Sequence, residues 1–252
     1  MHTILITGAA SGIGAGLARE LAQSGHHVIV SDRALDDARR VAGALGDEGL
    51  SSEAVALDVT SDPSVSAAVA SLTRPVDVLV NNAGLQHVAP LEEFAIERWD
   101  YLIQVMLTGV ARLTRAILPG MRARGFGRIV NIGSIHSLVA SPYKSAYVAA
   151  KHGLLGLSKV IALETAKVDI TINTICPSYV RTPLVDQQIA AQARSHGIPE
   201  SEVIDRMMLE PMPKHAFIGV DELAGITRFL ISPAARNITG QTLVVDGGWT
   251  VR

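Results

Sequence analysis

The alternation of short apolar runs with longer helical segments constrains the fold of this chain most. Seven apolar runs read as strands: Ile4–Ile6, His27–Val30, Glu53–Leu57, Val76–Val80, Arg128–Ile132, Ile170–Ile175 and Leu243–Val245. Helical segments separate most of them: Ile13–Ser24, Asp36–Leu45, Asp62–Leu72, Glu97–Ala123 (with a possible break near Pro119-Gly120) and Tyr143–Ala166. Strands that are buried on both faces are continuously apolar, as these are. The pattern predicts an α/β fold with a doubly wound parallel sheet.

The alternation runs through residues 1–252 without a repeat, a linker or a low-complexity tract, which predicts a single Rossmann-like domain. One segment, 186–217, interrupts it, because it lacks a strand-like run and carries three prolines: Pro199, Pro211 and Pro213. Ligands bind open α/β sheets beyond the carboxyl ends of the strands. We therefore expect 186–217 to form a helical lid over a substrate, with a surface insertion as the alternative.

Composition excludes several classes of function. The net charge is −2 and aromatic residues make up 4 %, so neither a basic face nor a base-stacking surface for nucleic acid is indicated. Cys176 is the one cysteine, which excludes an intrachain disulfide and a cysteine-rich metal site, and we expect no metal. No apolar run approaches the roughly 18 residues of a membrane span, and the first residues lack the features of a signal peptide. We expect a cytoplasmic protein with no membrane partner.

A glycine-rich loop follows the first strand directly. Gly8, Gly12 and Gly14 lie between this strand and the first helix. Small residues let the backbone approach a pyrophosphate, and the helix N-terminus offers N–H donors. The third position of the usual G-x-G-x-x-G spacing would fall on Leu17, so the strand–loop–helix context carries the prediction of a dinucleotide site.

An acidic residue at the end of the second strand bears on which dinucleotide binds. Asp32 lies about 20 residues beyond the glycines, where a carboxylate binds the ribose hydroxyls of adenosine and repels a 2′-phosphate. This favours NAD over NADP. Arg33 could instead face a 2′-phosphate, and Asp32 could be an ordinary turn residue at a strand end.

Tyr147, Lys151 and Ser134 are the candidate catalytic groups. Tyr147 and Lys151 are four residues apart on a predicted helix and share a face. A free tyrosine has a pKa near 10, and a nearby ammonium together with a positively charged nicotinamide favours the tyrosinate. Ser134 follows the fifth strand and can hold a substrate oxygen while hydride moves to or from the nicotinamide. A lone Tyr/Lys pair would be an ordinary helix contact, but the glycine loop and Ser134 favour a catalytic site.

Several motifs occur together in one order: Thr7-Gly8-x-x-x-Gly12-Ile13-Gly14, Asn81-Asn82-Ala83-Gly84, Ser134, Tyr147-x-x-x-Lys151 and Pro177. In this set of motifs, which extends over the whole chain, the protein resembles the short-chain dehydrogenases/reductases. The resemblance implies Ser134, Tyr147 and Lys151 as catalytic residues. It implies cofactor contacts from Gly8, Ser11, Gly12, Ile13, Gly14, Asp32, Asp58, Val59, Asn81, Ala83, Gly84, Tyr147, Lys151, Pro177, Val180 and Thr182.

The chain departs from this family at Met106. The family carries an asparagine there, which helps hold a water that relays protons to the active-site lysine. A thioether is a weak acceptor without a donor and cannot replace an amide. We expect either a relay through backbone carbonyls and water or impaired catalysis.

Polar residues near the predicted catalytic groups bear on the substrate. Gln86, His136 and Lys144, with Gln187 and Gln188, would offer several donors to a small carboxylate if they converge, although each alone could be a surface group. The segments 81–90, 145–153, 180–185 and 245–250 resemble bacterial D-3-hydroxybutyrate dehydrogenases. This resemblance implies that Gln86, His136, Lys144 and Gln188 bind the carboxylate and that Trp249 closes near the pocket. Tyr179 and Ser178 stand where those enzymes have tryptophan and glycine.

The expected function is NAD-dependent, reversible oxidation of D-3-hydroxybutyrate, or a close 3-hydroxy acid, to acetoacetate. The alternatives are another short-chain dehydrogenase, acting on a sugar acid or a secondary alcohol, and a weakly catalytic nicotinamide-binding protein. The resemblance also implies a homotetramer, with the helices predicted at Glu97–Ala123 and Tyr143–Ala166 at the interface.

Overall fold

A parallel sheet forms the centre of the computed structural model, which describes residues 1–251, without the side chains of Pro183, Leu184, Gln188, Ala191 and Ser195. Its order is β3-β2-β1-β4-β5-β6-β7, and every neighbouring pair is parallel. The strands are β1 Thr3–Thr7, β2 His27–Asp32, β3 Ser52–Ala56, β4 Val78–Asn81, β5 Phe126–Ile132, β6 Asp169–Pro177 and β7 Thr242–Val245. All seven predicted strands are confirmed.

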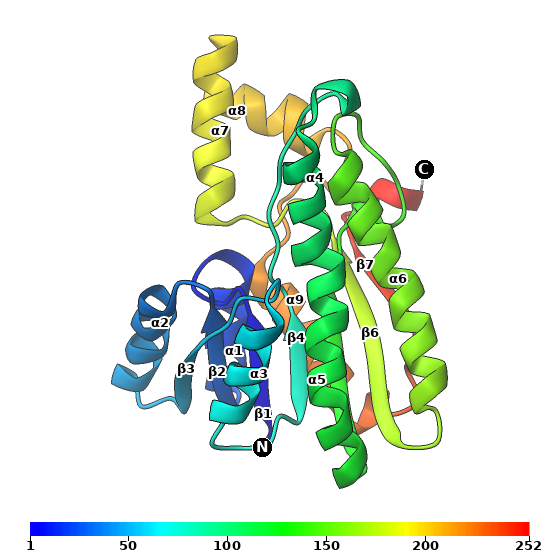
Figure 1. The fold of residues 1–252 in the computed structure, drawn as a ribbon. Helices are drawn as coiled ribbons and strands as arrows, with labels where there is room; N and C mark the ends of the chain where they lie inside the picture. The colour runs from blue at the N-terminus through cyan, green and yellow to red at the C-terminus, as the bar shows by residue number, and fades with distance from the viewer. Residues whose placement is uncertain (252) are drawn as a thin grey trace.

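Helices cover both faces of the sheet (Figure 1). One layer holds α1 Gly12–Gln23, α2 Leu35–Asp47 and α9 Val220–Ile231, and the other holds α3 Asp62–Ser71, α4 Ile96–Ile103, α5 Gly109–Arg124 and α6 Ser145–Thr165. Alternate residues of one strand serve the two layers: Ile4 and Ile6 pack into the core beneath α1, and Leu5 packs into the core beneath α5. This two-sided burial explains the continuous apolar runs.

Two features of the helices differ from the sequence-based prediction. A helix not predicted from the sequence, α9 Val220–Ile231, is present in the structure, with Leu223 and Leu230 buried. The helix predicted at Glu97–Ala123 is not broken near Pro119, which lies inside α5. Its α-helical geometry is interrupted instead by a π-helical turn, Gln104–Thr108, between α4 and α5. Burial of Ile117 and Met121 on either side of the proline offsets the hydrogen bond that a proline removes.

One helical stretch, Ile96–Arg124, is long and apolar enough to cross a membrane by length and composition alone, contrary to the expectation that no run approaches this. In the structure Leu102, Leu113 and Met121 of this stretch are fully buried in the core shared with the sheet. A core helix passes the same test of length and composition.

The segment that interrupts the alternation is helical, as predicted. It contains α7 Pro183–His196, the short α8 Glu200–Glu202 and a π-helical turn, Val203–Leu209, and it stands beyond the carboxyl ends of the strands (Figure 1). Its own small core contains Ile189, Val203 and Met208. Its role as a lid stays a prediction.

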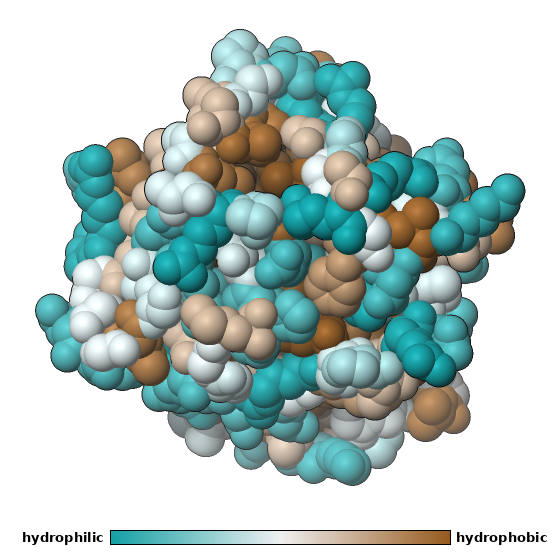
Figure 2. Space-filling view, turned by 90° about the horizontal axis from the view of Figure 1, so that it is seen from below, coloured by the Kyte–Doolittle hydropathy of each residue, from teal (hydrophilic) through white to brown (hydrophobic). Residues whose placement is uncertain are grey.

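The amino ends and the carboxyl ends of the parallel strands form two different faces of the molecule. The amino ends of the strands lie on the face shown in Figure 2, which is mostly hydrophilic with one larger hydrophobic area. The chain reverses its winding between β1 and β4, which are neighbours in the sheet. Ligands of open α/β sheets bind at the carboxyl end of such a switch point.

Candidate active site

The glycine loop is packed tightly against the loop that follows β4. Gly8 has φ +62°, and a Cβ atom there would lie 2.9 Å from the Cα of Ala83. The hydroxyl of Thr7 accepts hydrogen bonds from the backbone N–H groups of Asn82 and Ala83, at 3.0 Å each. These contacts fix two loops at the switch point of the sheet, and the first opens a helix N-terminus toward the space between them.

A cleft of about 580 Å³ begins at this point. Most of the residues expected to bind a cofactor line it: Gly8, Ser11, Gly12, Ile13, Asp32, Gly84, Tyr147, Lys151, Pro177, Val180 and Thr182. Asp58, Val59 and Ala83 line an adjoining cavity of about 180 Å³. Gly12, with φ +55°, leaves space where a side chain would stand. The cleft, its glycine cradle and its helix terminus fit a dinucleotide.

Two expected cofactor residues, Gly14 and Asn81, line neither space, and their contacts with a cofactor stay predictions. A Cβ atom at Gly14 would lie 2.5 Å from the Nδ2 atom of Asn82, so this glycine is required for packing of the loop. The amide of Asn81 is buried and donates to the Oδ1 atom of Asn131 at 2.8 Å. Because side chains of a strand alternate between faces, the next residue, Asn82, reaches the cleft instead.

The adjoining cavity, beside the end of β2, contains both a carboxylate and a guanidinium. The Oδ1 atom of Asp32 accepts a hydrogen bond from the backbone N–H of Ala34 at 3.1 Å. Arg33 donates to the hydroxyl of Tyr101 at 2.8 Å. The hydrogen bond from the Thr60 side chain holds the pKa of Asp58 below its usual range. Tyr101 was not predicted, since it lies within α4, far from any motif.

The three predicted catalytic residues meet at the carboxyl end of β5. Ser134, Tyr147 and Lys151 all line the cleft, and Lys151 is 5 % exposed. Its Nζ atom donates to the carbonyl oxygen of Ile132 at 2.6 Å and lies 5.6 Å from the centre of the Tyr147 ring. Burial lowers the pKa of Lys151 to about 8. The helix α6 thus presents Tyr147 and Lys151 to one site, as their spacing predicts.

The pKa of Tyr147 differs from the expectation. Burial raises it, and a hydrogen bond with the Ser134 side chain opposes this increase. Lys151 lies below the ring and donates to a backbone carbonyl instead of the phenol oxygen. In the protein alone, desolvation of the phenolate therefore outweighs the hydrogen bond with Ser134.

Met106 lies in the π-helical turn between α4 and α5 and is 1 % exposed. A Cβ atom at Gly84 would lie 3.7 Å from the Met106 sulfur, so the thioether packs behind the loop that lines the cleft. Lys151 donates a hydrogen bond to the backbone carbonyl of Ile132. One of the two expectations for Met106, a proton relay through backbone carbonyls and water, requires a contact of this kind.

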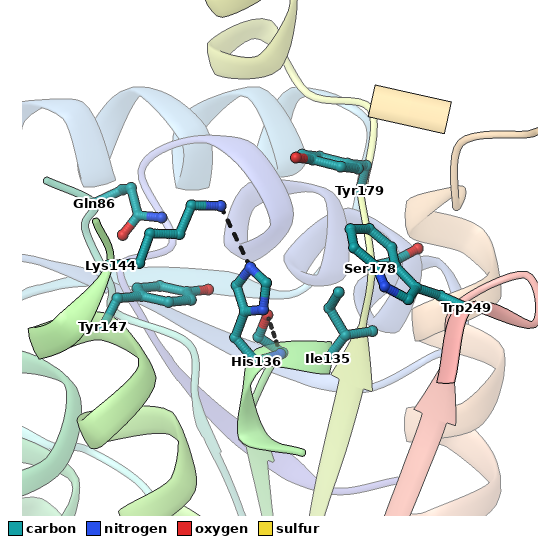
Figure 3. A pocket seen from close by; sticks show the side chains of 9 residues that line it. Gln86, Ile135, His136, Lys144, Tyr147, Ser178, Tyr179 and Trp249 are labelled. Carbon is teal, nitrogen blue, oxygen red and sulfur yellow. Dashed lines mark hydrogen bonds between the residues drawn. The ribbon is translucent and has the colours of Figure 1, made fainter. Parts of the chain in front are cut away.

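The predicted substrate residues converge on a smaller cavity of about 120 Å³ beside the catalytic groups (Figure 3). It is lined by Gln86, Ser134, Ile135, His136, Lys144, Tyr147, Ser178, Tyr179 and Trp249. Gln187 lines the adjoining cleft, whereas the side chain of Gln188 lies outside the described part of the structure. A cavity of this size suits a small substrate.

Two basic side chains lie together in this cavity. The Nζ atom of Lys144 is 3.3 Å from the Nε2 atom of His136, and the Nδ1 atom of His136 is buried without a hydrogen-bond partner. Burial, and then the charge of Lys144, lower the pKa of His136 to about 4. Burial also lowers the pKa of Lys144. A neutral imidazole next to an ammonium fits a site that binds an anion.

Some residues that shape the site were not predicted. A Cβ atom at Gly133 would lie 2.8 Å from the sulfur of Cys176, so β5 can end beside β6 only with glycine there. Ile135 forms part of the wall of the smaller cavity. Both follow β5 directly, and that position is the signal that could have identified them.

A dinucleotide cleft that ends on a buried serine, a buried lysine and a half-buried tyrosine defines a nicotinamide-dependent oxidoreductase. Residues 2–193 match the family model for short chain dehydrogenase. The chain belongs to this family.

Relatives and solved structures agree with this assignment. The chain is 45 % identical to a D-beta-hydroxybutyrate dehydrogenase of Rhizobium meliloti, over 99 % of each chain. It is 43 % identical to one of Cupriavidus necator, over 99 % of this chain and 98 % of the other. An actinorhodin polyketide ketoreductase, whose structure was determined with NADPH, superposes with a TM-score of 0.92 at 36 % identity, over 98 % and 97 % of the two chains.

Proposed function

We propose that the protein oxidises D-3-hydroxybutyrate, or a close 3-hydroxy acid, reversibly to acetoacetate or the matching 3-oxo acid, with NAD. The observation that carries the proposal is the small cavity in which Lys144 and His136 lie beside Ser134 and Tyr147. Both compared relatives named D-beta-hydroxybutyrate dehydrogenase support the same substrate class.

The residues suggest how the reaction proceeds. The Ser134 hydroxyl holds the oxygen on C3 of the substrate, and Tyr147 takes the proton of this hydroxyl. Lys151, next to the Tyr147 ring, favours the deprotonated phenol. When bound, the oxidised nicotinamide supplies the acceptor for the hydride that leaves C3. Lys144, His136 and Gln86 hold the carboxylate, so C3 is oriented toward the cleft.

NAD is the proposed cofactor because Asp32 lies at the adenosine end of the cleft, where a carboxylate disfavours a 2′-phosphate. The guanidinium of Arg33 is engaged by the Tyr101 hydroxyl. The helices of 186–217 are proposed to cover the bound substrate, since they follow β6 at the same end of the sheet.

We further propose a homotetramer with the long helices at its interfaces. Exposed apolar residues on them support this: Ile96 on α4 is 61 % exposed, and Val160 and Leu163 on α6 are 53 % and 80 % exposed. Such residues are typical of an interface when they gather on one surface. A monomer at all concentrations in sedimentation would contradict the proposal. A cytoplasmic location remains an expectation.

A substrate panel tests the proposed function. We expect turnover of 3-hydroxy acids in preference to neutral secondary alcohols and sugar acids, and with NAD in preference to NADP.

Lys144→Ala should mainly raise KM for the acids, because the lysine binds the ground state and the transition state alike. Tyr147→Phe should lower kcat by at least about 100-fold, since it removes the proton acceptor.

Binding of NADH to Tyr147→Phe, followed by its fluorescence, is the control for an intact cleft. A preference for neutral alcohols would reject the carboxylate site. Equal or better turnover with NADP would reject the cofactor assignment. Retained turnover in Tyr147→Phe would remove this residue from the mechanism.

A further inference from the structure

The wall of the substrate cavity that lies away from Lys144 is built by other strands. Gln86 follows β4, whereas Ser134 and His136 follow β5, the next strand in the sheet. Tyr179 follows β6 and Trp249 follows β7, on the other side of β5. Figure 3 shows Lys144 and Gln86 on one side of His136 and Trp249 on the other. A substrate whose carboxylate binds Lys144 therefore directs its other end toward Tyr179 and Trp249.

Tyr179 presents a polar group to the cavity. It lines both the smaller cavity and the large cleft, and its hydroxyl forms no hydrogen bond within the described part of the chain. In Figure 3 its ring reaches over the cavity with the hydroxyl foremost. The ring packs against Trp249 at 6.0 Å between centres, which fixes its position. Burial raises the pKa of Tyr179, so the hydroxyl is neutral and can donate as well as accept.

Its neighbour adds to the polarity of this wall. The hydroxyl of Ser178 donates to the sulfur of Met212 at 3.3 Å, and a thioether is a weak acceptor. An apolar methyl group against this wall would leave the Tyr179 hydroxyl without a partner once water is expelled, which weakens binding of such a substrate.

We infer that Tyr179 is a specificity residue, and that the preferred substrate is a 3-hydroxy acid with a second hydroxyl on C4. This inference rests on the proposed function, because it takes the carboxylate to lie at Lys144 and the reacting carbon at Ser134 and Tyr147. The oxidation itself is unchanged: the C3 hydroxyl loses a proton and C3 loses hydride to the oxidised nicotinamide. The C4 hydroxyl forms a hydrogen bond with the Tyr179 hydroxyl and takes no part in the oxidation.

The test compares two acids of equal size. In 3,4-dihydroxybutyrate a hydroxyl occupies the place that a methyl group has in 3-hydroxypentanoate, so polarity changes and heavy-atom count does not. For the unmodified enzyme we expect kcat/KM to be about tenfold higher for the dihydroxy acid, the effect of one hydrogen bond that would otherwise be lost. Tyr179→Phe should bring the ratio close to one, because it removes the hydroxyl that distinguishes the two acids.

Tyr143→Phe is the matched control, since Tyr143 is 59 % exposed and lines none of the three described cavities. It should leave the ratio unchanged. A ratio of one or less in the unmodified enzyme overturns the inference while turnover of 3-hydroxybutyrate upholds the proposed function. A raised ratio that Tyr179→Phe does not alter also overturns it. Turnover of neutral alcohols alone rejects the proposed function and the inference together.

Discussion

At the scale of single residues, His136 shows how burial and a neighbouring charge set the protonation state of a group in the site. It is 6 % exposed and lies beside an ammonium, and both features lower its pKa to about 4. Protonation of His136 would place a second positive charge beside Lys144. The His136 Nδ1 atom, which would then also carry a proton, forms no side-chain hydrogen bond. The native state therefore keeps this imidazole neutral at neutral pH.

This shift predicts an acid-dependent loss of stability. Between pH 6.5 and about 4 the unfolded chain binds a proton at His136 that the folded chain does not, so the free energy of unfolding falls as pH falls through this window. The contribution of this residue reaches up to about 3 kcal/mol. His136→Gln should lose less stability between pH 7 and pH 4.5 than the unmodified protein does, as measured by urea unfolding.

His2 and His26 also have lowered pKa values because of burial, but they are the same in both proteins and cancel in the comparison. Parallel pH dependence in the two proteins would contradict a neutral, buried His136.

At the scale of elements, the cofactor cleft depends on how closely β1, α1 and the loop after β4 approach one another. A Cβ atom at Gly14 would lie 2.5 Å from both the carbonyl oxygen of Gly8 and the Nδ2 atom of Asn82. Real Cβ atoms do not approach this closely, so a larger residue at this position must displace the loop.

Gly14→Ala should therefore raise the Kd for NADH by at least about tenfold, which corresponds to about 1.4 kcal/mol. Gly43→Ala is the matched control, because Gly43 lies in α2 with open space around its Cα atom. Alanine there should leave NADH binding unchanged and stabilise the protein by about 0.5–1 kcal/mol. Fluorescence titration and thermal unfolding measure the two effects. Unchanged binding in Gly14→Ala would contradict the packing role.

The elements also show what sequence alone can predict. The seven strands could be predicted because burial on both faces makes each one a continuous apolar run. The helix α9 was not predicted, although the side chain of Glu222 accepts a hydrogen bond from the backbone N–H of Gly219 at its start, a pairing that the sequence could have indicated. The π-helical turn at Met106 could not be predicted, since it depends on packing against Gly84 and the sheet and not on local propensity.

For the site, the motifs predicted which residues act but not how they are arranged. Ser134, Tyr147 and Lys151 were predicted from their order and spacing, and the structure brings them together. The packing roles of Gly14 and Asn81 depend on contacts with the loop after β4 and with β5, which no spacing within the sequence reveals. Contacts that join distant parts of a chain are in general the ones that pattern analysis misses.

At the scale of the whole molecule, the order of strands assembles the chemistry. The loop after β1 supplies the glycine cradle, and the ends of β4, β5 and β6 supply Gln86, Ser134 and Tyr179 at the same edge of the sheet. The cofactor cleft and the smaller cavity share Ser134 and Tyr147, so a bound cofactor and an acid would meet at these two residues. The proposed dehydrogenase activity follows from this shared boundary.

The most direct measurement is NADH formation at 340 nm from D- and L-3-hydroxybutyrate, assayed in parallel with NAD. In the proposed mechanism Lys144 holds the carboxylate, Ser134 and Tyr147 hold the oxygen on C3, and the hydride leaves toward the cleft. Three substituents of C3 are then placed, so only one enantiomer fits. We predict oxidation of the D enantiomer with NAD at least about 100-fold faster than that of the L enantiomer. Equal rates for the two enantiomers, or no NADH from either, would contradict the account.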